Sequence, residues 1–403
     1  MRRIVRALTL AGVALGLAAV PGCGVDPAKV PTHEVFAKDG ETAKRKKSVS
    51  FAVVGATRSV AYGAKAEPKA PLDIISDIRS QTAVRGLDFV VLTGGYVRRS
   101  TPDEWNRFGR RWQDVLQSNL SSKNKGRKPV IAMPGDGEIL GDKRLNGYGG
   151  AFPGTGTSIG FNRNASWGKA DIQLGKVTWR IVVVDTHQRA MGSRWQEQMF
   201  WLPKAVSEGK YDKLIVLMPD PRVTLADGAN MDPGDGPTQL IETIEEYAPM
   251  SALVAVISGG PATNEIILPS GAYGEAYVVA GNAGVNMPTL LQAGPADDAG
   301  YKDVGLEPLY TVALMQEFDR RSESEGYSEA VIDKAKGRGN WETYTPRFDG
   351  SAFAVQGWWV VDLEGESIAL TFRVRRPDGT LADLYKTKRG ARGGWKLQPV
   401  SAP

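Results

Sequence analysis

The chain has 403 residues, 42% of them hydrophobic, with 50 basic and 45 acidic residues and a formal net charge of +5. This length and apolar content suffice for one large core or two smaller ones, and they exclude a globally disordered protein. The basic residues are spread along the chain, whereas nucleic-acid binding uses clustered ones, so nucleic acid is not an expected partner. The one basic run, 44–47, is interpreted as a solvated linker facing anionic lipid.

Residues 1–22 have the composition of an export signal. A basic start is followed by an apolar segment, 7–20, which is too short to span a bilayer. The sequence Val-Pro-Gly-Cys that ends at Cys23 resembles a bacterial lipobox, in which the signal is cut before the cysteine and the thiol is acylated. The residues before Gly22 depart from the commonest version, and an ordinary cleaved signal is the alternative.

Cys23 is the only cysteine, so the fold contains no intramolecular disulfide, zinc–thiolate cluster or catalytic cysteine. We predict lipidation at Cys23 and a lipid-anchored location in the bacterial cell envelope. Gly24 stands where an aspartate would indicate inner-membrane retention, so the outer membrane is the expected membrane. Residues 23–48 lack periodicity and are predicted to be a flexible tether.

The segment 49–398 is predicted to be one folded domain. Apolar strands alternate in it with amphipathic segments, which is typical of an α/β fold. In chain order the predicted elements are strand Phe51–Val54, helix Pro71–Arg85, strand Phe89–Leu92, a helix from Thr101, strands Val130–Met133 and Trp179–Val184, helix Trp195–Val206, and strands Leu214–Met218 and Leu253–Ile257.

The C-terminal part has a different pattern. Residues 351–388 alternate apolar and polar side chains, and we interpret them as strands of a second sheet in the same domain. Trp358 and Trp359 are adjacent on a predicted strand and point to opposite faces, so one of them is a candidate for an exposed partner surface. The predicted elements here are helices 309–321 and 328–336 and strands 352–362, 367–375 and 381–386.

Loops rich in glycine and polar residues follow the strands of the first part. In open α/β sheets ligands bind at the carboxyl ends of the strands, so we expect these loops to converge on one crevice. Their order and spacing resemble the calcineurin-like metallophosphoesterases. The flanking residues that carry the resemblance are Gly55, Thr57-Arg58, Leu92-Thr93-Gly94, Tyr96-Val97, Met133-Pro134-Gly135, Glu138, Met218, Pro221 and Ser258-Gly259.

The resemblance implies a single-domain, two-sheet α/β/β/α sandwich and, in intact members, phosphoester hydrolysis at two metal ions. Gly95 stands where the family has the carboxylate that bridges the two metals, and Gly137 where it has the presumed proton-donating histidine. His187 is the only histidine in the predicted domain. The family's metal-ligand positions are occupied here by Ala56, Arg58, Gly95, Asp136, Gly137, Pro219, Asp220, Gly260 and Ala262.

The sequence therefore predicts a pseudoenzyme: an envelope lipoprotein with a metallophosphoesterase fold that has lost its dinuclear site, binds no metal or other cofactor, and acts as a binding or scaffold protein. Its partner would be an envelope protein or a phosphorylated ligand, neither of which the sequence identifies.

Two alternatives remain open. In the first, relocated ligands on the crevice loops bind one hard divalent cation such as Mg²⁺ or Ca²⁺, and the protein is a metal-dependent phosphoester hydrolase. In the second, Arg58, with Arg98 and Arg99 nearby, holds a phosphate through its guanidinium group, and the protein is a metal-free sensor of phosphorylated ligands. The candidate ligand-binding residues are Arg58, Asp136, Glu138, Asp185, His187 and Asp220.

Overall fold

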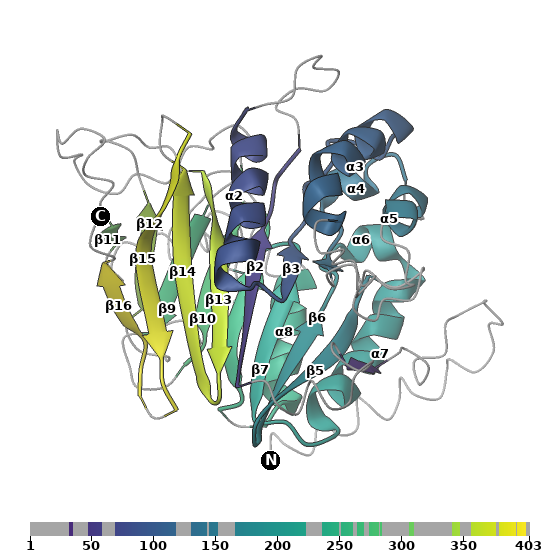
Figure 1. The fold of residues 1–403 in the computed structure, drawn as a ribbon. Coiled ribbons are helices and arrows are strands. Elements are labelled where there is room, and N and C mark those ends of the chain that lie inside the picture. The colour runs from purple at the N-terminus through teal and green to yellow at the C-terminus, as the bar shows by residue number, and fades with distance from the viewer. Residues whose placement is uncertain are drawn as a thin grey trace, which may run out of the picture.

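The structure is a computed structural model, and its strands form two sheets flanked by helices (Figure 1). The predictions for the signal peptide, Cys23, Ala262 and the helix at 328–336 lie outside the described residues. No helix within the described residues has the length and apolar character needed to cross a membrane. The described residues are 32–34, 47–58, 69–117, 130–142, 145–151, 166–222, 236–249, 251–260, 264–269, 274–281, 283, 306–309, 341–346, 356–375, 379–391 and 393–399.

The first sheet combines strands from both ends of the described chain, in the order β16-β15-β14-β13-β2-β3-β4. β13 pairs antiparallel with β2, which places Val361 opposite Phe51. The C-terminal strands therefore extend the sheet of the first three predicted strands and do not form a sheet of their own. The strands are β2 (Ser48–Val54), β3 (Phe89–Leu92), β4 (Val130–Ala132), β13 (Gly357–Glu364), β14 (Ser367–Arg375), β15 (Leu381–Arg389) and β16 (Lys396–Pro399).

The second sheet has the order β1-β5-β6-β7-β8-β10-β9-β12-β11. Its central strands β6, β7 and β8 are parallel and match the predicted strands of the middle of the chain. Leu309, predicted to begin a helix, ends β11. The strands are β1 (Thr32–Glu34), β5 (Gly168–Leu174), β6 (Val177–Val183), β7 (Lys213–Met218), β8 (Leu253–Ser258), β9 (Asn264–Pro269), β10 (Ala276–Ala280), β11 (Leu306–Leu309) and β12 (Trp341–Pro346).

β1 lies within the segment predicted to be a tether. It pairs parallel with β5, with Thr32 opposite Lys169 and Glu34 opposite Asp171. Part of the predicted tether is thus an edge strand of the second sheet.

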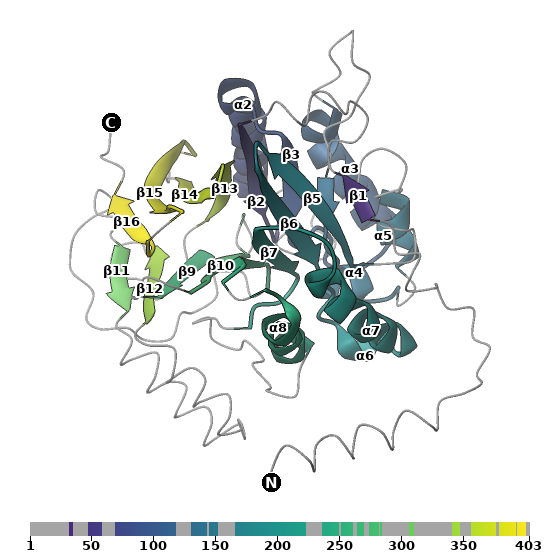
Figure 2. The ribbon, with the colours of Figure 1, turned by 90° about the horizontal axis from the view of Figure 1, so that it is seen from below.

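The helices cover the outer faces of the two sheets. α2 and α3 pack on the first sheet, and α7 and α8 on the second, so the layers follow one another as α/β/β/α (Figure 2). The predicted fold class is confirmed. The helices are α2 (Lys69–Arg85), α3 (Pro102–Gln117), α4 (Asp136–Ile139), α5 (Asn146–Ala151), α6 (Gln188–Met191), α7 (Ser193–Ser207) and α8 (Gly236–Tyr247).

The central strands of the two sheets, such as β3, β7 and β8, are buried on both faces. In β2, Phe51 and Val53 face the core between the sheets, while Ala52 and Val54 face α2 and α3. The same alternation buries Trp359 between the sheets and Trp358 beneath the helices, and both side chains are 0% exposed. The prediction that one of them faces a partner was therefore wrong, because helices cover the face that was expected to be open.

Candidate functional site

The loops after the strands converge as predicted, and backbone hydrogen bonds join them. The Ala56 amide donates to the Gly94 carbonyl at 2.9 Å, and the Arg58 amide donates to the Gly95 carbonyl at 3.0 Å. The Thr93 hydroxyl donates to the Ala280 carbonyl at 2.8 Å and so ties the first sheet to the second. The loops of the two sheets are therefore hydrogen-bonded to one another.

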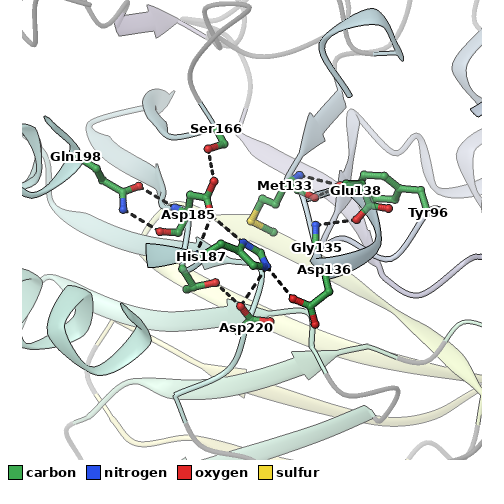
Figure 3. Close-up of polar contacts among 11 residues, drawn as sticks. Tyr96, Met133, Gly135, Asp136, Glu138, Ser166, Asp185, His187, Gln198 and Asp220 are labelled. Carbon is green, nitrogen blue, oxygen red and sulfur yellow. Dashed lines mark hydrogen bonds and ion pairs between the residues drawn. The ribbon is translucent and has the colours of Figure 1, made fainter. Parts of the chain in front are cut away.

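His187 lies at the centre of a polar cluster built from three of these loops (Figure 3). Its Nδ1 is 2.8 Å from Asp185 Oδ1, and its Nε2 is 3.5 Å from both Asp136 Oδ1 and Asp220 Oδ2. The ring is 9% exposed, and Nε2 is buried without a hydrogen bond. Asp136 follows β4, Asp185 and His187 follow β6, and Asp220 follows β7. These four predicted ligand-binding residues are thus brought together.

Asp185 is the fixed member of the cluster. It is 1% exposed, and its Oδ2 accepts a hydrogen bond from the Ser166 hydroxyl. The Gln198 side chain makes two hydrogen bonds with the Asp185 backbone. It accepts one from the amide and donates one to the carbonyl, each at 2.8 Å. Asp185 therefore contacts His187 from the buried side of the ring. Asp136, whose side chain is 89% exposed, contacts the ring from the solvent side.

The charges of the cluster depend on one another. Burial disfavours a charged imidazole, but Asp220, Asp136 and Asp185 together raise the pKa of His187 well above its usual value. Burial also opposes ionisation of Asp185, yet its hydrogen bonds with His187 and Ser166 lower its pKa. The contact with His187 lowers the pKa of Asp136 as well. Burial raises the pKa of Asp220, against the opposing effects of His187 and the Thr186 hydroxyl. These shifts favour a protonated His187 beside ionised Asp136 and Asp185, and they oppose ionisation of Asp220.

Glu138 does not face the crevice. It is 0% exposed, and its two carboxylate oxygens accept hydrogen bonds from the amides of Val97 at 2.8 Å, Gly95 at 2.9 Å and Gly135 at 2.7 Å. Burial raises the pKa of Glu138, and the three amides oppose this rise. Its carboxylate joins the loop after β3 to the loop after β4, so this predicted candidate holds the backbone instead of a ligand.

The arginines predicted to bind phosphate lie near acidic groups. Arg58 is partly exposed, and its charge lowers the pKa of Asp136. Arg98 and Arg99 are exposed on the loop that leads to α3. A phosphate approaching Arg58 would also approach the Asp136 carboxylate. This arrangement gives the phosphate-sensor hypothesis no added support.

Ser166, Gln198 and Tyr96 were not predicted to support the site. Ser166 and Gln198 contact Asp185, while the Tyr96 hydroxyl accepts a hydrogen bond from the Met133 amide at 2.8 Å and donates to the Leu92 carbonyl at 2.9 Å. Ser166 and Gln198 carry no local sequence signal, since each is 13 residues or more from Asp185 in the chain. The only feature of the sequence that pointed to Tyr96 was its place among the flanking residues of the family pattern.

Comparison with solved structures identifies the fold family. No protein family and no curated protein matches the sequence. The purple acid phosphatase PPD1 from yellow lupin (Lupinus luteus) seeds aligns with 86% of this chain and 54% of its own, at 12% identity and a TM-score of 0.52. PhoD aligns with 89% of this chain and 73% of its own, at 12% identity and a TM-score of 0.50. The fold is that of the metallophosphoesterases.

The metallophosphoesterase fold implies a dinuclear metal centre, and the residues of this chain do not fit one. By the sequence resemblance, Gly95 takes the position of the bridging carboxylate and Ala56 that of the first ligand. Ala56 has a φ of 51° and no side-chain oxygen. Within the described residues, no group of three or more histidine, cysteine, aspartate and glutamate side chains could hold a metal ion. A shared fold does not by itself establish a shared activity, because activity depends on the residues of the site.

Replacing Glu138 by alanine should lower the free energy of unfolding by about 2–4 kcal/mol, because the amides of Val97, Gly135 and the partly buried Gly95 lose their acceptor. Urea unfolding of the two proteins measures this. The matched control is Glu366→Ala, since Glu366 has a side chain 48% exposed and only a 3.9 Å ion pair with Lys213. That change should cost less than about 1 kcal/mol. Equal effects at the two positions would contradict the assigned role of Glu138.

The stability of the protein should fall as the pH rises above about 6.5, the ordinary pKa of histidine. The folded protein binds the His187 proton more tightly than the unfolded chain does. This contribution is complete below about pH 6.5 and is lost as the pH approaches the raised folded pKa. Urea unfolding between about pH 6 and pH 9 measures it, with His187→Gln as the control that has no ring proton. Identical pH dependence in the two proteins would show that His187 is not stabilised as an imidazolium.

Proposed function

We propose that this protein is a non-catalytic binding or scaffold protein built on the metallophosphoesterase fold and held at the bacterial envelope by a lipid on Cys23. The proposal rests on what occupies the metal-ligand positions of the fold. Alanine, glycine and proline side chains have no donor atom, and the arginine at position 58 is cationic. Only Asp136 and Asp220 offer oxygen donors there among the described residues, whereas metal affinity depends on the number and type of donors.

The observation that carries the proposal is the closed space at these positions. A Cβ atom added to Gly137 would collide with the Val97 carbonyl oxygen, and one added to Gly260 would collide with the Pro221 ring. At Gly95, where φ is +73°, an added Cβ would lie 3.0 Å from the Ala56 Cα atom. The loops have packed into the volume that ligand side chains would need.

The residues at these positions also lack a group that could act as the general acid. Phosphoester hydrolysis at two metals requires a bridged, metal-activated hydroxide and a proton donor to the leaving group. Gly137 cannot donate a proton, and the buried Glu138 beside it is bound to three amides. We therefore assign no catalytic residue.

The alternative of a hydrolase with relocated ligands receives one supporting observation, the meeting of Asp136, His187 and Asp220. In this arrangement, however, Nε2 of His187 lies in ion-pair contact with both carboxylates. An imidazolium has no lone pair for a metal, so His187 in that state would not serve as a ligand. The two hypotheses differ in whether added metal ions produce phosphoester hydrolysis.

We expect no phosphoester hydrolysis. The full chain, incubated with p-nitrophenyl phosphate or bis(p-nitrophenyl) phosphate and with Mn²⁺, Zn²⁺, Fe²⁺ or Mg²⁺, should show the same rate as a variant with both Asp136→Asn and Asp220→Asn. Release of p-nitrophenol measures the rate. A metal-dependent rate that the double variant loses would replace the scaffold proposal by the hydrolase alternative.

The lipid anchor is tested at Cys23. We expect the wild-type protein to fractionate with membranes and to carry the mass of a lipid-modified N-terminal cysteine. Cys23→Ser should remain unmodified and leave the lipid-rich phase in detergent partitioning. Membrane association that persists unchanged in Cys23→Ser would show that something other than an acyl chain holds the protein there.

A further inference from the structure

The hairpin of β15 and β16 carries an unbalanced positive charge. It lies at the edge of the first sheet (Figure 1). Residues 384–403, which include most of it, contain five basic residues and no acidic one. Three of the basic residues are lysines of the two strands, Lys386, Lys388 and Lys396. Lys388 and Lys396 are exposed, and Lys386 is partly exposed.

The three lysines share one face of the sheet. Lys388 pairs with Lys396 across the antiparallel strands, and Lys386 is two residues from Lys388, so the three side chains point to the same side. Thr387, between the two lysines of β15, points to the other side and pairs with Leu370, which belongs to the core between the sheets. The lysines therefore lie on the outer face, and we call them the lysine face.

The protein does not neutralise these charges. Side chains of like charge directly opposite each other destabilise an antiparallel pair. Within the described residues, none of the three lysines forms an ion pair. Asp362 lies in the same row as Lys388 but two strands away, about 10 Å. Its carboxylate accepts a hydrogen bond from the Ser50 hydroxyl at 2.5 Å. An anion from outside the chain would relieve the repulsion.

We propose that the lysine face binds the anionic headgroups of a phospholipid bilayer and so determines which side of the domain lies on the membrane. This inference goes beyond the proposed function and rests on the envelope location proposed there. A lipid on Cys23 would hold the protein near the bilayer, and the lysine face would orient it.

The chemistry of the face fits a bilayer better than a single bound anion. A lysine ammonium group is a compact, strongly hydrated charge on a flexible chain, and it lacks the planar fork with which arginine binds one phosphate. Several lysines on one strand face suit a surface of many headgroups. Each lysine close to an anionic leaflet strengthens binding roughly fivefold.

The chain enters the first sheet at the same end as the lysine face. β2 begins at Ser48, and the basic run 44–47 immediately precedes it in the sequence. The segment that leads from Cys23 therefore joins the sheet at the end where Lys388 and Lys396 lie. One row of paired residues crosses five strands at this end, through Ser50, Asp362, Ala369, Lys388 and Lys396.

The experiment measures cosedimentation with lipid vesicles of a chain comprising residues 24–403, which lacks the acylated cysteine and contains every described strand and helix. Vesicles of phosphatidylcholine are compared with vesicles of equimolar phosphatidylcholine and phosphatidylglycerol. Binding should require phosphatidylglycerol and should weaken as salt is added, because salt screens the charges. Changing Lys386, Lys388 and Lys396 together to glutamine should weaken binding on the order of 100-fold.

The matched control removes the same charge from other parts of the surface. Lys69→Gln, Arg110→Gln and Lys204→Gln change three exposed residues on α2, α3 and α7. This variant should bind the vesicles as the unaltered chain does. Circular dichroism of both triple variants checks that they are folded.

Four results would overturn the proposal. Equal binding to both kinds of vesicle would show that headgroup charge is not recognised. Equal losses in the two triple variants would show that only net charge matters. Lysine-dependent binding to polyglutamate without binding to vesicles would make an acidic protein the partner. Aggregation of the lysine variant, with unchanged vesicle binding of its soluble fraction, would assign the lysines to protection of the sheet edge.

The p-nitrophenyl phosphate assay separates this inference from the proposed function. Metal-dependent hydrolysis would end the scaffold proposal and leave the lysine face untouched. A chain without hydrolytic activity that does not bind phosphatidylglycerol vesicles would end only the inference about the lysine face.

Discussion

Burial of the central strands of both sheets on both faces is the constraint from which the rest of the structure follows. One apolar core lies between the sheets, and two others lie under α2 with α3 and under α7 with α8. Strands enclosed in this way have apolar side chains on both faces, which leaves the strand ends as the place where polar groups from many strands can meet. The candidate site occupies that place because the parallel strands of the two sheets bring their carboxyl ends to the same side of the sandwich.

Hydrogen bonds and ion pairs of the chain's own side chains connect the loops after the strands. Glu138 binds the amides of two loops, and Arg111 donates to the carbonyls of Thr57 and Tyr96, which follow different strands. His187 connects the loops of the second sheet with Asp136 of the first. Each of these connections joins loops that are far apart in the sequence.

The sequence predicted the regular part of this structure and the membership of the cluster. The apolar runs identified the central strands within a few residues, and their loops correctly placed Asp136, Asp185, His187 and Asp220 near one another. It did not predict α8, β5, β9, β10 or β12. Nor did it show that Glu138 turns inward, since the direction of a side chain after a glycine turn depends on which amides the neighbouring loop presents. The error at Trp358 and Trp359 had a similar cause: alternation along a strand says which residues share a face, and only the packed helices decide whether that face meets water.

The position of β1 sets a limit on how far the domain can stand from a membrane. Nine peptide units separate Cys23 from Thr32, the first residue of β1. Even fully extended, such a segment spans only about 30 Å. If Cys23 carries a lipid, the pairing of β1 with β5 keeps one edge of the second sheet within that distance of the bilayer, because the residues between β1 and β2 no longer add to the reach. The edge of the second sheet that β1 forms would then be the part of the domain whose distance from the bilayer is most restricted.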